Sequence, residues 1–356
     1  MWKKIWLGLV GLVLGLIIYL YVRYPRPNLQ AEVADKDYCE MYGIEFDTSS
    51  IEAIYENPAA VQQAGEQFRS RDPAYQFFNT HRQRVNKRFP VELWEKTLER
   101  LSSLPIDKRK QQLPFRMYQD FMAQKQTFCK QVIPFVKTYL PEGTDLSATV
   151  YITALENAAA GGALQREIAY TLSSPLFTTA ARIHRQSGAT SVFNLLGHEL
   201  AHIGYGVHND LHSFSEEEMR KNEIVIDILS PIHNDGFATY VSYQLSERYP
   251  IPFEWPHWVF KREFFVKWYL QRVNDLLALA GTPAGTEEYN ETYRRIGIFG
   301  YNQMGFYVVG AHMAMTIEEH YGREALVKTV EDGFYAFVDT YNSVAAEQMK
   351  IHYTLR

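Results

Sequence analysis

The residues with the clearest chemistry lie between positions 197 and 208, in the stretch GHELAHIGYGVH. His198 and His202 are four residues apart, so on a helix both imidazoles project from one face and can bind one metal ion. Glu199 projects beside them, where its carboxylate can take a proton from a water that the metal activates. The pattern predicts a Zn2+ site with His198 and His202 as ligands and Glu199 as the catalytic base.

A catalytic zinc ion needs a third protein ligand and one open position. His208 lies ten residues after His198, which is the spacing of the third ligand in HExxHxxGxxH, the metzincin pattern. That pattern needs glycine at position 205, where this chain has Tyr205 between Gly204 and Gly206. A metzincin-like site using His208 is therefore an alternative, and the competing interpretation of His208 is a polar residue just after a helix end.

A second candidate ligand lies in the stretch HNDGFATYVSY, which begins at position 233. HELAH followed by this stretch resembles the gluzincins, specifically their aminopeptidase-N-like branch. In that family a glutamate on a second helix, followed by Gly-x-Ala, is the third zinc ligand. The matching position here is Asp235, followed by Gly236-Phe237-Ala238. The resemblance implies that Asp235 is a zinc ligand, and the small residues at 236 and 238 would let its helix pack close to the first.

Aspartate in place of glutamate shortens the reach by one methylene group, so the two helices would have to lie closer together. If Asp235 is not a ligand, it is expected to be an N-cap carboxylate on the helix that it opens. His233 and Glu223 are two further candidates for the third ligand.

A later segment, YVVGAHMAMTIEEHYGREAL, is similar to the Tyr-x-x-Gly helix of the same family. There the tyrosine hydrogen-bonds the oxyanion of the tetrahedral intermediate. The resemblance implies this catalytic role for Tyr307, three residues before Gly310, with Tyr301 as the next candidate. The competing interpretation is a tyrosine packed in the core, since the chain has 24 tyrosines.

A third segment, GGALQREIAYTLSS, occupies the place where the aminopeptidases carry Gly-x-Met-Glu-Asn before an edge strand. Such a strand, expected here over residues 166–172, would pair with the extended backbone of a substrate. Ala163-Leu164-Gln165 replaces Met-Glu-Asn, so the carboxylate that binds a free amine in that family is absent at this position. The departure argues against aminopeptidase activity and favours an endopeptidase or an unusual exopeptidase. The resemblance covers roughly residues 148–326.

These residues predict a zinc-dependent peptidase that hydrolyses peptide bonds by Glu-assisted attack of a zinc-activated water. Its partner is then a peptide or protein substrate. The alternative is a zinc-binding protein, or a hydrolase of another substrate, without peptidase activity. With a net charge of −5 the chain has no overall basic character, so nucleic acid is not an expected partner.

Periodicity indicates which elements must hold these residues. Strands are expected over 148–155 and 166–172, with a loop over 157–162, because both segments are rich in β-branched and aromatic residues. A helix should carry the HELAH motif and end at Gly204 or Gly206. Further helices are expected over 216–229, over 236–247 and throughout the chain after position 256.

The N-terminus contains an uncharged run, from Ile5 to Val22, between Lys4 and Arg23. At about 1.5 Å per residue the run is close to the thickness of a bilayer core, so it predicts one uncleaved, single-pass anchor in the lipid bilayer. The lysines before it favour a catalytic domain outside the cytoplasm. Cys39 and Cys129, the two cysteines, could form a disulfide or stay as buried free thiols.

The expected fold class is α+β and mostly helical: a zincin-like (gluzincin) catalytic core with a small mixed sheet, preceded by a helical lobe and one N-terminal transmembrane helix. The expected domains are a transmembrane anchor over 1–23, a tether over 24–50, a helical lobe over 51–147 and a zincin-like metallopeptidase domain over 148–356. The 356 residues, 46% of them hydrophobic, are enough to bury a sizeable core.

Overall fold

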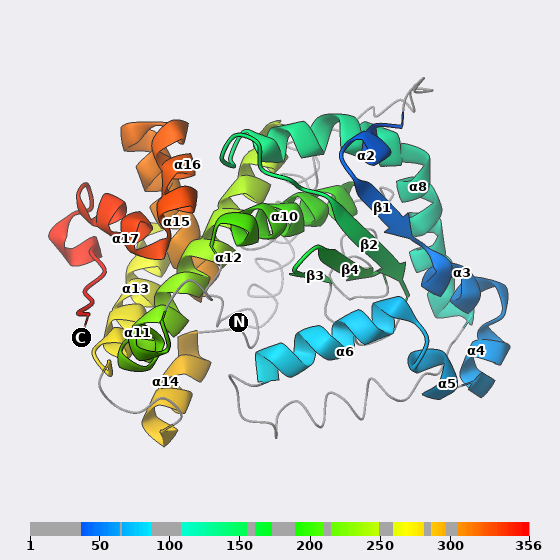
Figure 1. Cartoon of the computed structure of the whole chain (residues 1–356), viewed down its shortest axis with the longest axis horizontal. Coiled ribbons are helices and arrows are strands. Elements are labelled where there is room, and N and C mark those ends of the chain that lie inside the picture. Colours follow the sequence, from blue (N-terminus) through cyan, green and yellow to red (C-terminus); the bar gives the residue numbers. More distant parts are fainter. Residues whose placement is uncertain are drawn as a thin grey trace, which may run out of the picture.

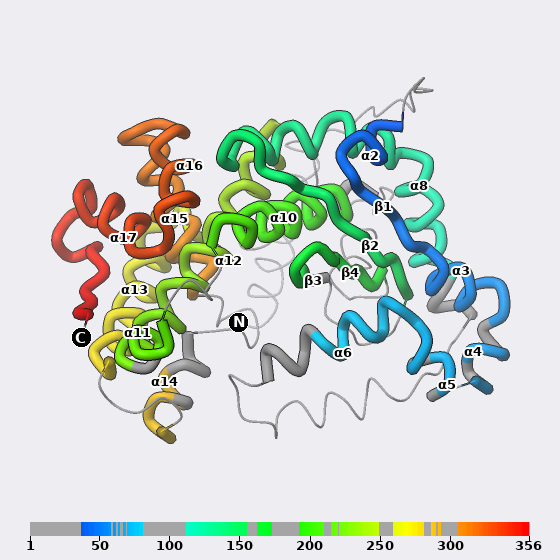
Figure 2. Tube along the Cα trace, in the orientation of Figure 1, coloured from blue at the N-terminus to red at the C-terminus, as the bar shows by residue number. Residues whose placement is uncertain are grey.

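A computed structural model describes residues 37–64, 66–86, 108–154, 161–172, 189–209, 215–248, 259–280, 286–296 and 305–355, which are the coloured ribbons of Figure 1. Figure 2 follows the chain as a tube in the same orientation. Most of these residues are helical. In chain order the elements are α2 (Tyr38–Met41), β1 (Ile44–Asp47), α3 (Ser49–Glu56), α4 (Pro58–Ala64), α5 (Glu66–Arg69), α6 (Pro73–Asn86), α8 (Lys108–Lys137), β2 (Ala148–Thr153), β3 (Gly161–Leu164), β4 (Glu167–Thr171), α10 (Ala189–His208), α11 (Glu216–Lys221), α12 (Glu223–Arg248), α13 (Glu263–Leu277), α14 (Glu287–Ile296), α15 (Gly305–Tyr321), α16 (Arg323–Asp332), α17 (Phe334–Asn342) and the short 3-10 helix η3 (Glu347–Met349).

The four described strands form one mixed sheet with the order β1-β2-β4-β3. β2 pairs in parallel with both β1 and β4, whereas β3 and β4 form an antiparallel hairpin. The predicted strands over 148–155 and 166–172 are confirmed as β2 and β4. Their β-branched side chains are buried: Val150 and Ile168, which are partners in the register, are both 0% exposed.

Two features of the sheet differ from the expectations. β1 lies in the segment expected to be a tether, and Gly161 and Gly162 belong to β3 instead of a loop. Because β4 lies between β2 and β3, the prediction of an edge strand over 166–172 is wrong, and β3 is the strand at that edge. Glycine and alanine give β3 little β propensity, so its pairing with β4 decides its conformation.

α8 contains two prolines. Pro114 and Pro134 lie inside this 30-residue helix. Each proline removes one helical hydrogen bond, but burial of the helix compensates. Phe121 and Ile133, for example, are both 0% exposed.

α12 packs against both α10 and α15 (Figure 1). α12 was expected as two helices with a break before position 236, but it runs unbroken through Pro231. Apolar side chains surround it on most sides, with Ile228, Ile232 and Val241 fully buried. A helix that is apolar nearly all round belongs in a core, and contact with its neighbours holds it together despite the proline.

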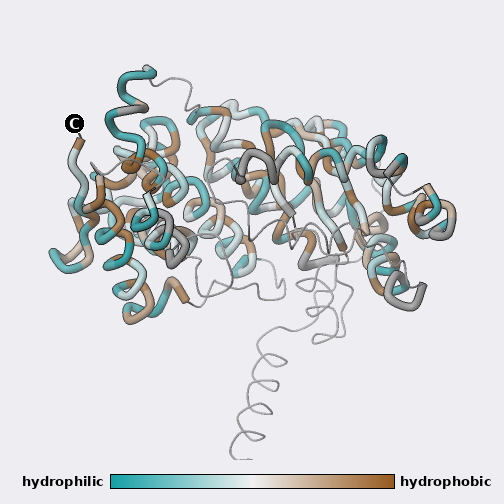
Figure 3. The backbone as a smooth tube through the Cα atoms, turned by 90° about the horizontal axis from the view of Figure 1, so that it is seen from below, coloured by the Kyte–Doolittle hydropathy of each residue, from teal (hydrophilic) through white to brown (hydrophobic). Residues whose placement is uncertain are grey.

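The part of the chain that the structure describes contains no helix long and apolar enough to cross a membrane. Its long helices carry charged side chains, such as Asp120 in α8 and Asp227 in α12, and Figure 3 shows hydrophilic and hydrophobic residues alternating along the helices. This finding corrects the predicted fold class, which included a transmembrane helix. The structure supports a mostly helical fold with a small mixed sheet; the predicted anchor over 1–23 lies outside the described residues.

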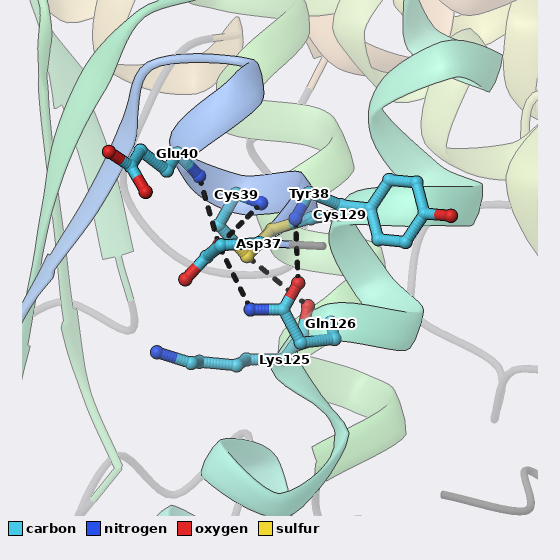
Figure 4. The surroundings of a disulfide bond; sticks show 7 residues. All are labelled: Asp37, Tyr38, Cys39, Glu40, Lys125, Gln126 and Cys129. Carbon is cyan, nitrogen blue, oxygen red and sulfur yellow. Dashed lines mark hydrogen bonds between the residues drawn. A yellow bond between two sulfur atoms is a disulfide. The ribbon is translucent and has the colours of Figure 1, made fainter. Parts of the chain in front are cut away.

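A disulfide between Cys39 and Cys129 joins α2 to α8 and settles a question that the sequence left open (Figure 4). Asp37 caps α2, since its Oδ1 accepts hydrogen bonds from the backbone N–H groups of Cys39 and Glu40. Gln126 of α8 donates to the same oxygen. The disulfide and these hydrogen bonds fix the start of the described chain on α8.

Candidate metal centre

The centre of α10 carries the two histidines of the HELAH motif. Their Nε2 atoms lie 3.0 Å apart, and their rings meet edge to face with centroids 4.6 Å apart. The opposite side of α10 is apolar, with Leu196 and Leu200 both 0% exposed. Burial of that side turns His198 and His202 together toward α12 and α15.

The other ring nitrogen of His202 is held by a residue that sequence reasoning missed. Nδ1 of His202 lies 2.8 Å from the side-chain oxygen of Asn234 on α12. Because that oxygen can only accept, Nδ1 carries the proton and Nε2 keeps a lone pair. This is the tautomer that a metal ligand needs, fixed by a partner behind the site. The only signal in the sequence was an amide immediately before Asp235.

Asp235 is the third group near the histidines. Its Oδ1 lies 3.7 Å from Nε2 of His202, and both side chains are largely buried, with exposed fractions of 22% and 14%. Zn–N and Zn–O bonds of about 2.0–2.1 Å in a tetrahedron place the ligand atoms about 3.3 Å apart. The two separations lie within a few tenths of an ångström of that value. As they stand, no three His, Cys, Asp or Glu side chains in the described ranges are arranged to hold a metal ion. The donor types and these pair distances fit zinc, provided that the side chains close in slightly.

Asp235 lies in the middle of α12, so the alternative interpretation of Asp235 as an N-cap carboxylate is wrong. Glu223 and His233, the remaining candidates for the third ligand, both point away from the histidine pair. Glu223 is exposed at the first position of α12, about 18 Å along the axis from Asp235 at 1.5 Å per residue. His233 is fully buried, with its ring nitrogens facing Tyr205 and Thr329.

His208 does not approach the histidine pair. α10 continues to His208, so neither Gly204 nor Gly206 ends the helix as expected. Ten helical residues separate His208 from His198 by about 15 Å along the axis. Nε2 of His208 instead lies 2.8 Å from the Thr144 hydroxyl. Gly204 serves packing, because a Cβ there would lie 2.2 Å from Cδ1 of Leu140.

Tyr307, in the first turn of α15, lies against the histidine pair. Its ring stacks on that of His198 with an interplanar angle of 10° and centroids 6.1 Å apart. The negative charge of Asp235, then burial, then the charge of Glu199 raise the pKa of Tyr307 well above its ordinary value. The phenol is thus a neutral hydrogen-bond donor close to both carboxylates. Tyr301, the next candidate, lies outside the described residues.

Two glycines bring α15 and α12 into backbone contact. A Cβ on Gly236 would lie 2.2 Å from the Cα of Gly310, and a Cβ on Gly310 would lie 1.9 Å from the carbonyl oxygen of Ile232. Gly236 adjoins Asp235, and Gly310 is one turn after Tyr307. Gly236 was expected to bring α12 close to α10; the structure shows that it brings α12 close to α15, and with it Asp235 close to Tyr307.

Glu199 is 5% exposed and lies one position after His198. Its charge contributes to the raised pKa of Tyr307, which places it within electrostatic reach of the phenol. The structure therefore brings together five of the residues that the sequence singled out. These are His198, Glu199, His202, Asp235 and Tyr307.

Two imidazoles and carboxylates on packed helices are the donor chemistry of a zinc-dependent hydrolase. A family model described as "Putative zinc dependent peptidase (DUF5700)" matches residues 66–350. The match covers well over half of the chain, so the chain belongs to this family, and its cofactor is Zn2+. No curated protein and no solved structure matches the chain.

Proposed function

We propose that this protein is a gluzincin-type peptidase in which His198, His202 and Asp235 bind the zinc ion. The observation that carries the proposal is the 3.7 Å approach of Asp235 to the same Nε2 atom that lies 3.0 Å from His198. Neutral imidazoles and one carboxylate form a ligand set with a single negative charge. That set leaves a fourth position for water or substrate.

When bound, zinc would act as a Lewis acid toward a substrate carbonyl and lower the pKa of a coordinated water to about 7. Glu199 would take the proton of the attacking water and pass it to the nitrogen of the departing amine. Its burial favours this role, because it keeps bulk water away from the proton that is transferred. Tyr307 would donate its O–H to the oxyanion that forms on the former carbonyl.

The substrate would pair with β3, the edge of the sheet that also contacts α10. An extended peptide can add to such an edge through backbone hydrogen bonds. β3 carries no acidic side chain, so it offers no carboxylate to a free amino terminus. We therefore favour cleavage within a chain over removal of its first residue.

The disulfide supports a location in an oxidising compartment, since intracellular reductants keep most cysteines as thiols. This agrees with the expectation that the catalytic domain lies outside the cytoplasm.

The decisive experiment is the substitution Glu199→Gln. The variant should bind one zinc ion as the wild type does, because Gln keeps the shape of Glu199, yet lose turnover by about 10²–10⁴-fold without the base. Zinc content by elemental analysis and cleavage of a peptide library with blocked termini, with and without chelator, would measure both. Glu216→Gln, on the exposed α11, is the matched control and should change neither. Peptidase activity retained in Glu199→Gln would overturn the proposal.

A further inference from the structure

Polar side chains join α10 to α12 at three levels. Ser242 Oγ donates to Asn194 Oδ1 at 2.6 Å. His202 meets Asn234 at 2.8 Å, and the hydroxyl of Tyr205 meets Nδ1 of His233 at 3.2 Å. As α10 runs from position 194 to 205, α12 runs back from 242 to 233, so the helices are antiparallel and the three pairs follow one register.

The two outer pairs are buried and play no part in the proposed chemistry. Asn194 and His233 are 0% exposed, Ser242 is 2% exposed and Tyr205 is 3% exposed. Buried polar groups gain little net stability, because desolvation offsets most of each hydrogen bond. Their usual effect is on specificity: a misaligned register leaves them without partners, which costs about 1–3 kcal/mol for each group.

The Tyr205–His233 pair also contacts a third helix, α16. Thr329 of α16 donates its hydroxyl hydrogen to the carbonyl of Leu326 and lies 3.4 Å from Nε2 of His233. With that hydrogen used, Nε2–H of His233 is the donor to Thr329, and Nδ1 accepts from Tyr205. His233 is 0% exposed, so these two partners satisfy both of its ring nitrogens inside the core.

The position of Asp235 depends strongly on the register of α10 against α12, because aspartate has a short side chain. A slip of one residue turns a helix by 100° and moves it 1.5 Å along its axis. Aspartate has one methylene fewer than glutamate with which to compensate. Asp235 would then lose its approach to Nε2 of His202.

We propose that Asn194–Ser242 and Tyr205–His233 are positioning pairs that fix the register of α10 against α12 and so bring Asp235 to the two histidines. This inference rests on the proposed function, because it takes the ligands to be His198, His202 and Asp235. Asn194, Ser242, Tyr205 and His233 touch neither metal nor substrate in this scheme, and act through the ligand that they align.

The test compares Tyr205→Phe and Ser242→Ala with two variants that remove a buried hydroxyl outside the two positioning pairs. Tyr341→Phe, on α17, loses a hydrogen bond to the carbonyl of Met349 in η3. Thr239→Val removes a hydroxyl that has no hydrogen-bond partner in the described part of the chain. For each purified protein, the zinc Kd is measured by competition with a chromophoric chelator. The unfolding temperature of the metal-free form and the visible spectrum of the Co2+-substituted form are measured as well.

The positioning variants should weaken zinc binding by about tenfold, as substitutions behind metal ligands commonly do. They should also change the Co2+ spectrum, which reports the ligand set. Tyr341→Phe should lower the unfolding temperature yet leave the zinc Kd and the spectrum as in the wild type. A purely stabilising role for Tyr205 and Ser242 would move only the unfolding temperature.

Unchanged zinc affinity and spectrum in both positioning variants would overturn the inference. If Tyr205→Phe fails to fold, Ser242→Ala decides alone, since alanine suits a helix interior. Failure of the proposed function looks different. A wild-type protein that binds no zinc, or an Asp235→Ala variant that binds zinc as tightly as the wild type, would overturn the ligand assignment itself and the positioning role with it.

Discussion

At the scale of single residues, Asp235 and His208 lead to opposite expectations for zinc binding. Asp235→Ala should weaken zinc binding by about 10²-fold or more, because a three-ligand site would lose its only anionic donor. His208→Ala should leave the zinc Kd unchanged, since His208 lies on Thr144, about 15 Å along α10 from His198. Competition with a chelator measures both. If His208→Ala weakened zinc binding more than Asp235→Ala, the metzincin-like alternative would be favoured.

Tyr307 allows a second test at this scale. Tyr307→Phe should lower kcat by about 10²–10³-fold with little change in KM, because a donor aimed at the oxyanion acts mainly in the transition state. The zinc content should stay the same, since the phenol is not a proposed ligand. Tyr321→Phe is the control: Tyr321 is 50% exposed at the other end of α15 and should have no effect on kcat. Full activity in Tyr307→Phe would remove this residue from the mechanism.

At the scale of helices, the crossing of α12 and α15 sets the distance between Asp235 and Tyr307. Gly310→Ala would place a methyl group 1.9 Å from the carbonyl oxygen of Ile232, and two backbones cannot yield as side chains do. We expect a loss of about 1–3 kcal/mol in unfolding free energy, together with reduced activity, as α15 moves away. Chemical denaturation and peptidase assays measure the two effects.

Gly206→Ala is the matched control for that substitution. Gly206 is also inside a helix, but a Cβ there would meet nothing within 4 Å. Alanine should therefore stabilise α10 by about 0.5–1 kcal/mol through backbone entropy alone. A Gly310→Ala protein as stable and active as Gly206→Ala would mean that the crossing does not depend on glycine.

The same helices show how far sequence reasoning reaches. His198 and His202 could be placed because their spacing matches one helical turn, and β2 and β4 because β-branched residues fill them. Asp235 and Tyr307 came from motifs, yet their proximity depends on the contact of Gly236 with Gly310, which no local pattern reveals. The continuity of α12 through Pro231 and the pairing of β3 were missed for a related reason. Tertiary contacts, which local propensity does not contain, decide both.

At the scale of the whole molecule, segments far apart in the sequence complete one fold. β1 precedes the region matched by the family model, but it pairs with β2 and extends the sheet. α2 and β1 are held by the disulfide to α8, which packs against α10. The disulfide therefore attaches α2 and β1 to α8, and α8 in turn supports α10, the helix that carries the two histidines.

This arrangement predicts that the disulfide serves stability and leaves catalysis alone. A Cys39→Ser/Cys129→Ser variant should lose about 2–5 kcal/mol of unfolding free energy, since the bond closes a loop with a sequence separation of 90 residues. Its zinc Kd should match that of the wild type. The disulfide joins α2 to α8, whereas the two histidines are on α10. Denaturation with and without reductant measures the effect: reductant should bring the wild type down to the variant and leave the variant unchanged. A variant as stable as the oxidised wild type would show that the hydrogen bonds of Asp37 and Gln126 suffice to hold α2 on α8.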